Sequence, residues 1–240
     1  MARGLRLTSE LVARVPRSVA QPVAHGHERA LASDEDHANA LAAIHASRPA
    51  LGATRDFWVF AYGSLIWNPC FSYTAASPAR AHGWHRSFCI GWMTRFRGSS
   101  VNPGLMMALD RGGSCEGIAY RLPEDDIDNA LITLIKREMP FVVSGMSARW
   151  MRLMTGEGPL DAVGFPVNRA APDYLPGLSE EQVVTSLATA AGSAGSMAEY
   201  LLNTITHLQA NGIYDRTLWR LQDRVATRLE EVSPRDEPGA

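Results

Sequence analysis

The order in which the predicted elements follow one another constrains the fold of this chain most. Aromatic and β-branched residues, or apolar residues at every second position, predict strands. These strands cover residues 58–62, 81–93, 105–109, 115–121, 149–154 and 161–167. One helix interrupts them before Pro140, and helices alone follow residue 178. Regular alternation of strand and helix, which would build a parallel sheet, is missing. We therefore expect an α+β fold with a mixed, mostly antiparallel, β-barrel-like sheet flanked by helices.

Three local patterns refine this expectation. Residues 81–93 fit one long strand or a hairpin, with Arg86 on the same face as the apolar residues. The Asp-Arg-Gly-Gly-Ser run at 110–114 predicts a hairpin turn between two strands. The helix before Pro140 is acidic near its start and basic near its end, as the helix dipole favours, and Pro123 is expected in its first turn.

The chain has 240 residues, of which 46% are hydrophobic, which is enough for one domain with extensions. We expect the compact domain over 56–232. A partly helical N-terminal extension over 1–55 would precede it, and a polar tail over 233–240 would follow. Within the extension, short helices are predicted over 7–15 and from Ser33 onwards.

Charge and cysteine content narrow the class of protein. The formal net charge of −2 gives no electrostatic footprint for nucleic acid or a membrane surface. There is no run of 18 apolar residues and no apolar segment typical of a secretory signal. Cys70, Cys89 and Cys115 are odd in number and scattered, which favours reduced thiols. We expect a cytoplasmic protein that binds neither nucleic acid nor membrane.

No motif predicts a cofactor. His82 and His85 would lie on opposite faces of a strand, and the histidines at 25–45 have no Cys or clustered carboxylate at ligand spacing. Walker-type and Gly-x-Gly-x-x-Gly loops are absent. Ser64 lacks the Gly-x-Ser-x-Gly pattern of a nucleophile elbow, so we interpret it as a hydrogen-bond donor in a loop.

The strand over 58–62 ends abruptly at Gly63-Ser64. A glycine there lets the backbone turn with a positive φ and lets a ligand come close. Consecutive free N–H groups in such a turn form a concave site for a carboxylate or an oxyanion. The alternative is an ordinary loop after a strand.

Glu138 continues the apolar stripe of its helix. It follows Ile127 by eleven positions and Leu131 by seven, which places it within about 20° of both. A carboxylate is rarely buried without a partner, and burial raises its pKa towards the range in which it can act as a base and then as an acid. The alternative is a glutamate that turns outward or pairs with Arg137 or Arg149.

Two motifs together resemble the ChaC-like γ-glutamylcyclotransferases: Tyr62-Gly63-Ser64-Leu65 after an early strand, and Lys136-Arg137-Glu138 at the end of a helix. The resemblance covers roughly residues 57–230. Further segments resemble the bacterial branch, namely 105–121, 172–175, 192–201 and 215–221.

The resemblance implies a γ-glutamylcyclotransferase-like fold and an enzyme without a cofactor. Its small-molecule substrate would be glutathione, whose α-amine attacks its own γ-carbonyl to give 5-oxoproline and Cys-Gly. Glu138 would be the catalytic base, and Tyr62, Gly63, Ser64 and Leu65 would bind the substrate. By analogy, the loop over 95–104 is expected to face the leaving dipeptide.

Two departures bear on specificity. Many relatives have Gly-Tyr a few residues after the catalytic Glu, whereas the nearest equivalent here is Gly145-Met146, after a longer segment. Leu105 stands where many eukaryotic relatives have Arg after Pro-Gly. Both departures are expected to affect substrate preference and rate more than the type of reaction. Two alternatives therefore stay open: a cyclotransferase for other γ-glutamyl amines or dipeptides, and a catalytically silent module that binds γ-glutamyl or carboxylate ligands.

Overall fold

The structure is a computed structural model that describes residues 4–16, 30–49, 56–94 and 96–231. The chain forms two compact units, each assembled from separate stretches of sequence. Unit 1 contains the described residues of Met1–His25, Gly91–Met106 and Pro176–Ala240. Unit 2 contains those of Gly26–Ile90 and Met107–Leu175.

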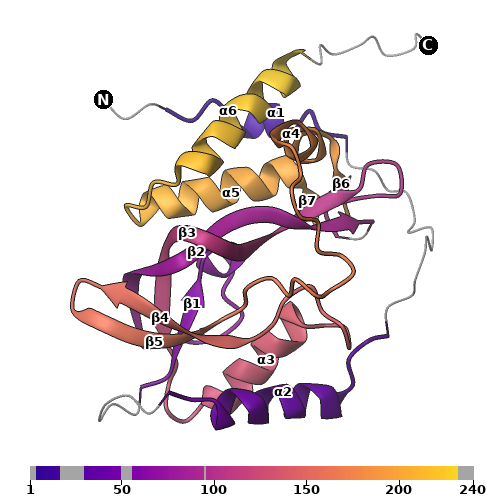
Figure 1. The fold of residues 1–240 in the computed structure, drawn as a ribbon. Helices are drawn as coiled ribbons and strands as arrows, with labels where there is room; N and C mark the ends of the chain where they lie inside the picture. The colour runs from indigo at the N-terminus through magenta and orange to yellow at the C-terminus, as the bar shows by residue number, and fades with distance from the viewer. Residues whose placement is uncertain (1–3, 17–29, 50–55, 95, 232–240) are drawn as a thin grey trace. The chain divides into compact units, whose positions relative to one another are not determined.

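A closed barrel with the strand order β1-β3-β2-β4-β5 forms the centre of unit 2 (Figure 1). The strands are β1 (Trp58–Ala61), β2 (Ala75–Met93), β3 (Gly104–Arg121), β4 (Arg149–Thr155) and β5 (Gly158–Gly164). The pairs β1–β3, β2–β4 and β4–β5 are antiparallel, whereas β1 and β5 pair in parallel with Val59 opposite Val163. The predicted mixed, barrel-like sheet is confirmed.

The barrel encloses a core of apolar side chains from every strand. The central cluster consists of Phe60, Tyr62, Ala79, Ala81, Leu109, Cys115, Ala119, Met151, Leu153 and Ala162. Val59, Phe60 and Ala61 are all fully buried, so both faces of β1 are covered. This burial explains why β1 is uniformly apolar rather than alternating, and each large side chain contributes about 1.5–3 kcal/mol.

The predicted hairpin turn at 110–114 is wrong. β3 runs without interruption from Gly104 to Arg121. Gly112 and Gly113 do have positive φ angles of 107° and 69°, but these conformations lie within the strand instead of reversing it. Glycines inside a strand can mark a bend rather than a turn, and the neighbouring strands decide which of the two forms. β2 is likewise one long strand, as one of the two alternatives predicted.

Two helices, α2 (Asp34–Ala46) and α3 (Ile127–Glu138), pack side by side in unit 2 (Figure 1). Ser33 begins α2 with a capping box. The prediction that Pro123 lies in the first turn of α3 is wrong. The N–H of Asp126 donates to the carbonyl of Pro123 (3.1 Å), so a separate turn precedes the helix and Asp126 stands at its cap.

Unit 1 consists mainly of helices, as predicted for the end of the chain. They are α1 (Ser9–Val12), α4 (Glu180–Thr189), α5 (Met197–Ala210) and α6 (Arg216–Glu231). The short strands β6 (Ala191–Gly192) and β7 (Gly195–Ser196) pair between α4 and α5. Ser179 caps α4 with a full capping box, whereas at α5 the carboxylate of Glu199 pairs with Arg97 instead (3.1 Å).

The N-terminal segment contributes to both units. In unit 1, the side chains of Leu7, Leu11 and Val15 are buried. In unit 2, Ile44 of α2 is buried and its carbonyl accepts a hydrogen bond from Nε1 of Trp150 (2.9 Å). The proposed boundary between residues 55 and 56 stays a prediction. The segments over 17–29 and 50–55 and the predicted polar tail lie outside the described residues.

Within the described ranges, none of the helices combines the length and the apolar character needed to cross a membrane.

Candidate active site

The end of β1 leads directly into a tight turn. Tyr62 follows the strand, Gly63 comes next, and the 3₁₀ helix η1 covers Ser64–Ile66. The N–H of Ile66 donates to the carbonyl of Gly63 (2.9 Å). Because the first amides of a helical turn have no acceptor within it, the N–H groups of Gly63, Ser64 and Leu65 are not used by η1. The predicted positive φ of Gly63 is wrong, since its φ is −138°.

Contacts inside unit 2 hold the side chain of Tyr62, which is 6% exposed. Its hydroxyl donates to the backbone carbonyl of Phe165 (2.7 Å), and the same oxygen lies 3.8 Å from Sδ of Met146. The hydroxyl hydrogen therefore takes part in a hydrogen bond within the protein. Met146, one of the two positions at which the sequence is expected to depart from the family pattern, lies beside this hydroxyl and therefore within the candidate site.

A buried arginine fixes the peptide group between Tyr62 and Gly63. Arg86, on β2, is 5% exposed, and its Nε donates to the carbonyl of Tyr62 (2.6 Å). Its Nη2 also donates to the carbonyl of Glu116. In a trans peptide the N–H points away from the C=O, so anchoring the Tyr62 carbonyl also orients the N–H of Gly63. The sequence placed Arg86 on an apolar strand face without indicating this role.

Glu138 is the last residue of α3, and its side chain is 12% exposed. Burial raises the pKa of this carboxyl, and the nearby charge of Arg137 opposes that effect without cancelling it. Oε1 of Glu138 lies 3.4 Å from Nε of Arg137. The structure thus combines two features treated as alternatives in the sequence: the carboxylate is mostly buried, and it lies next to an arginine.

Arg137 connects the carboxylate to the turn after β1. Its Nη2 donates to Oγ of Ser64 (3.0 Å) and its Nη1 donates to the carbonyl of Asn68 (2.8 Å), while Nε faces Glu138. One guanidinium group therefore brings the end of α3 and the start of η1 together. From the sequence, Arg137 is expected only to complement the helix dipole or to pair with Glu138. The only feature of the sequence that points to a role for Arg137 in the site is its position next to Glu138.

The arrangement suits proton transfer next to a developing negative charge. A carboxylate with a raised pKa can take up and return a proton near neutral pH. Unpaired turn amides and a guanidinium group stabilise an anion. Cys89 offers no competing nucleophile, because burial raises the pKa of its thiol to about 11. In the described part of the chain, no group of three or more His, Cys, Asp or Glu residues could hold a metal ion.

Gly145, just before Met146, lies where a side chain would not fit. A Cβ atom at this position would lie 2.8 Å from Oδ2 of Asp173 and 3.0 Å from Cγ2 of Ile90. The other departure, Leu105, is buried in unit 1. The expectation that the loop over 95–104 faces the leaving dipeptide stays a prediction.

Comparison with known proteins gives concordant matches. The family model for ChaC-like proteins matches residues 57–228. The glutathione-specific γ-glutamylcyclotransferase of Escherichia coli (strain K12) is 36% identical over 208 residues, covering 86% of this chain and 87% of that protein. Glutathione-specific γ-glutamylcyclotransferase 1 of Mus musculus is 32% identical over 185 residues, covering 74% and 82%.

Among solved structures, the glutathione-specific γ-glutamylcyclotransferase from yeast has a TM-score of 0.65 at 20% identity. The match covers 72% of this chain and 97% of that one. At this level of identity the likeness concerns the fold, which agrees with the barrel described above.

Proposed function

Because the chain belongs to the family of ChaC-like proteins, we propose that it is a γ-glutamylcyclotransferase that converts glutathione to 5-oxoproline and Cys-Gly. The names of the E. coli and mouse relatives support this activity. One observation of the site carries the proposal: Glu138 has a mostly buried carboxyl with a raised pKa, and Arg137 links it to the turn after β1.

In the proposed reaction, the carboxylate of Glu138 removes a proton from the α-ammonium group of the γ-glutamyl moiety. The freed amine attacks the γ-carbonyl carbon, and a C–N bond closes the five-membered ring. The original amide C–N bond then breaks. The departing amine of Cys-Gly takes up the proton held by Glu138 and the second proton that the ring nitrogen loses as it becomes the amide N–H of 5-oxoproline, and it leaves as an ammonium group. Nucleophile and electrophile belong to one molecule, so holding the chain curled supplies much of the rate enhancement.

The turn after β1 has the anion-binding role in this proposal. The N–H groups of Gly63, Ser64 and Leu65 hold the substrate carboxylate or the oxyanion that forms on the γ-carbonyl. Tyr62 supplies a fixed wall, because its hydroxyl hydrogen is already donated to Phe165. Arg137 contacts both Ser64 and Glu138, which fixes their relative positions, and it adds positive charge to the site.

The site also supports a second candidate function, which is the same chemistry on other γ-glutamyl amines or dipeptides. Met146 lies against the hydroxyl of Tyr62, and it is the nearest equivalent of the tyrosine expected from the family resemblance. A thioether offers no hydrogen-bond donor, so this position is suited to a substrate whose nearby atoms need none. Relative turnover of glutathione and of γ-glutamyl dipeptides distinguishes the two substrates.

The deciding experiment measures 5-oxoproline release from reduced glutathione by the wild type, Glu138→Gln and Glu157→Gln. Glu157 is an exposed glutamate in the turn between β4 and β5, so its variant controls for loss of a carboxylate elsewhere. We expect the wild type and Glu157→Gln to be equally active and Glu138→Gln to lose at least a hundredfold in rate. Full activity in Glu138→Gln would refute the assigned base.

If the wild type binds glutathione but releases no 5-oxoproline from it or from γ-glutamyl dipeptides, the protein is a silent binding module instead.

We further propose that it works in the reducing cytoplasm, on a small molecule and without nucleic acid. Among the described residues, Cys70, Cys89 and Cys115 are not joined in disulfides, which supports this location.

A further inference from the structure

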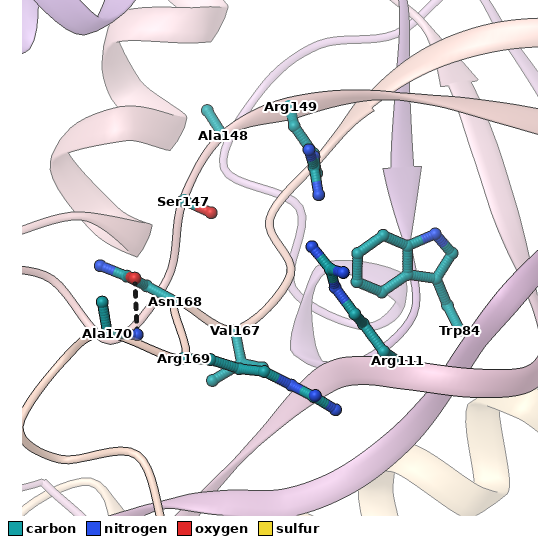
Figure 2. Close-up of a pocket in the computed structure, with 9 residues that line it drawn as sticks. All are labelled: Trp84, Arg111, Ser147, Ala148, Arg149, Val167, Asn168, Arg169 and Ala170. Atoms are coloured by element: carbon teal, nitrogen blue, oxygen red, sulfur yellow. Dashed lines mark hydrogen bonds between the residues drawn. The ribbon is translucent and has the colours of Figure 1, made fainter.

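A pocket of about 350 Å³ opens in unit 2 and shares no residue with the candidate active site. Its polar and aromatic lining consists of Trp84, Arg111, Ser147, Arg149, Asn168 and Arg169 (Figure 2). The three arginines come from β3, from the start of β4 and from the segment after β5. Like charges gathered at one opening repel one another unless a negative charge lies among them.

One of the three charges is already compensated. Nη2 of Arg169 lies 2.6 Å from Oδ1 of Asp110, whose other oxygen accepts a hydrogen bond from the hydroxyl of Tyr174 (3.0 Å). Asp110 is 8% exposed. Burial alone would raise the pKa of Asp110, but hydrogen bonds from Arg111 N–H, Arg169 and Tyr174 lower it overall, so the group is an anion.

The other two charges are not compensated. Arg111 and Arg149 form no ion pair with any residue that the structure describes. No acidic residue is among the lining residues. Figure 2 shows the guanidinium ends of both side chains directed toward the same part of the pocket. The opening therefore presents two guanidinium groups, each of which can bind an oxyanion through two parallel hydrogen bonds.

The walls around these two groups are fixed. Cζ of Arg149 lies 5.7 Å from the centre of the Trp84 ring, a cation–π distance that restrains the guanidinium group. Asn168 uses its amide within the loop, since Oδ1 accepts from the N–H of Ala170 (3.1 Å) and Nδ2 donates to the carbonyl of Ser144 (3.2 Å). The hydroxyl of Ser147 faces the opening in Figure 2. The site thus offers two guanidinium groups, a hydroxyl and an indole face.

We propose that this pocket binds a small organic anion with at least two negative charges, carried by phosphate or carboxylate groups, through Arg111 and Arg149. Its volume lies at the lower end of the range for small-molecule sites. The proposal does not depend on the cyclotransferase activity, because neither Glu138 nor the turn after β1 takes part.

The test is calorimetric titration of the wild type with inorganic pyrophosphate and, separately, with citrate. The variants are the double substitution Arg111→Gln/Arg149→Gln and the control Arg216→Gln, which removes an exposed arginine at the start of α6. We expect the wild type and the control to bind at least one probe equally, and the double variant to bind it at least tenfold more weakly. Binding of one probe alone identifies the anionic group.

Absence of saturable binding of both probes at millimolar concentration overturns the proposal, as does equal affinity in the double variant. Arg111 and Arg149 are exposed, so their replacement should leave the unfolding temperature of the protein unchanged within a few degrees. An added titration with glutathione completes the design. If glutathione displaces the probe from the wild type, the pocket is part of the substrate site and the proposal of a separate anion site fails.

Discussion

At Glu138, burial and the charge of Arg137 act on one carboxyl in opposite directions, and burial is the stronger of the two. A general base works only when it is deprotonated, so kcat/KM for 5-oxoproline release should rise with pH along a limb whose midpoint lies above the ordinary glutamate value of 4.5. Arg137→Gln removes the opposing charge and should move this midpoint to higher pH. A pH–rate profile measures both. A limb at or below the ordinary value would contradict the assigned base.

The same carboxyl should make stability depend on pH. Its pKa is raised in the folded protein, so the folded state is favoured below the unfolded pKa, and this contribution is lost as pH rises through the folded pKa. Glu138→Gln removes the ionisation. The variant should therefore be more stable than the wild type at pH 8, and the difference should vanish near pH 4. Each tenfold change in the ionisation constant corresponds to about 1.4 kcal/mol.

Urea unfolding at several pH values tests this second expectation, with Glu157→Gln as the matched control. That variant loses an exposed carboxylate and should show the pH dependence of the wild type. A Glu138→Gln variant that is less stable than the wild type at pH 8 would mean that the carboxylate is stabilised by its surroundings, in conflict with a raised pKa.

Among the elements, the end of β1 and the start of η1 are held from three sides. Arg86 anchors the Tyr62 carbonyl, Arg137 binds Ser64, and the Phe165 carbonyl accepts the hydroxyl hydrogen of Tyr62. None of these contacts is local in sequence. The turn owes its position to β2, α3 and the segment after β5, so the element can present its amides in one orientation.

Tyr62→Phe tests how much one of these contacts contributes. The substitution leaves the buried carbonyl of Phe165 without its hydrogen-bond donor, which should cost about 1–3 kcal/mol of unfolding free energy. Denaturant unfolding measures the loss. Tyr73→Phe is the control, because Tyr73 is 47% exposed and makes ring contact with Tyr120. Equal stability of the two variants would show that the Phe165 contact contributes nothing.

At the scale of the whole molecule, the described N-terminal segment over 4–16 belongs to a folded unit. Oε1 of Gln222, in α6, accepts hydrogen bonds from the backbone N–H groups of Arg6 (3.1 Å) and Leu7 (2.9 Å). Gln222 is 1% exposed, and Leu7, Leu11 and Val15 are buried. The N-terminal segment therefore covers apolar surface of α5 and α6 within unit 1.

Deletion of residues 1–16 should therefore destabilise the protein strongly. Three buried apolar side chains at about 1.5–3 kcal/mol each predict a loss of roughly 4 kcal/mol or more. Thr8→Ala, which removes the N-cap of α1 alone, should cost about 1 kcal/mol. Urea unfolding of both variants, with dye binding to detect exposed apolar surface, measures the difference. A truncated protein as stable as the wild type would make the segment a dispensable extension.

The sequence by itself determined what depends on neighbouring residues. Alternation and apolar runs predicted the strands. Local pattern also predicted a helix from Ser33 onwards and only helices after residue 178, and helical spacing placed Glu138 on the buried side of α3. Tertiary structure decided what depends on distant residues. It kept β3 continuous across 110–114, used Arg137 and Arg86 to hold the turn after β1, and grouped the arginines of the anion pocket. Closing a barrel brings together residues that lie tens of positions apart. Contacts between such residues cannot be predicted from a local sequence pattern.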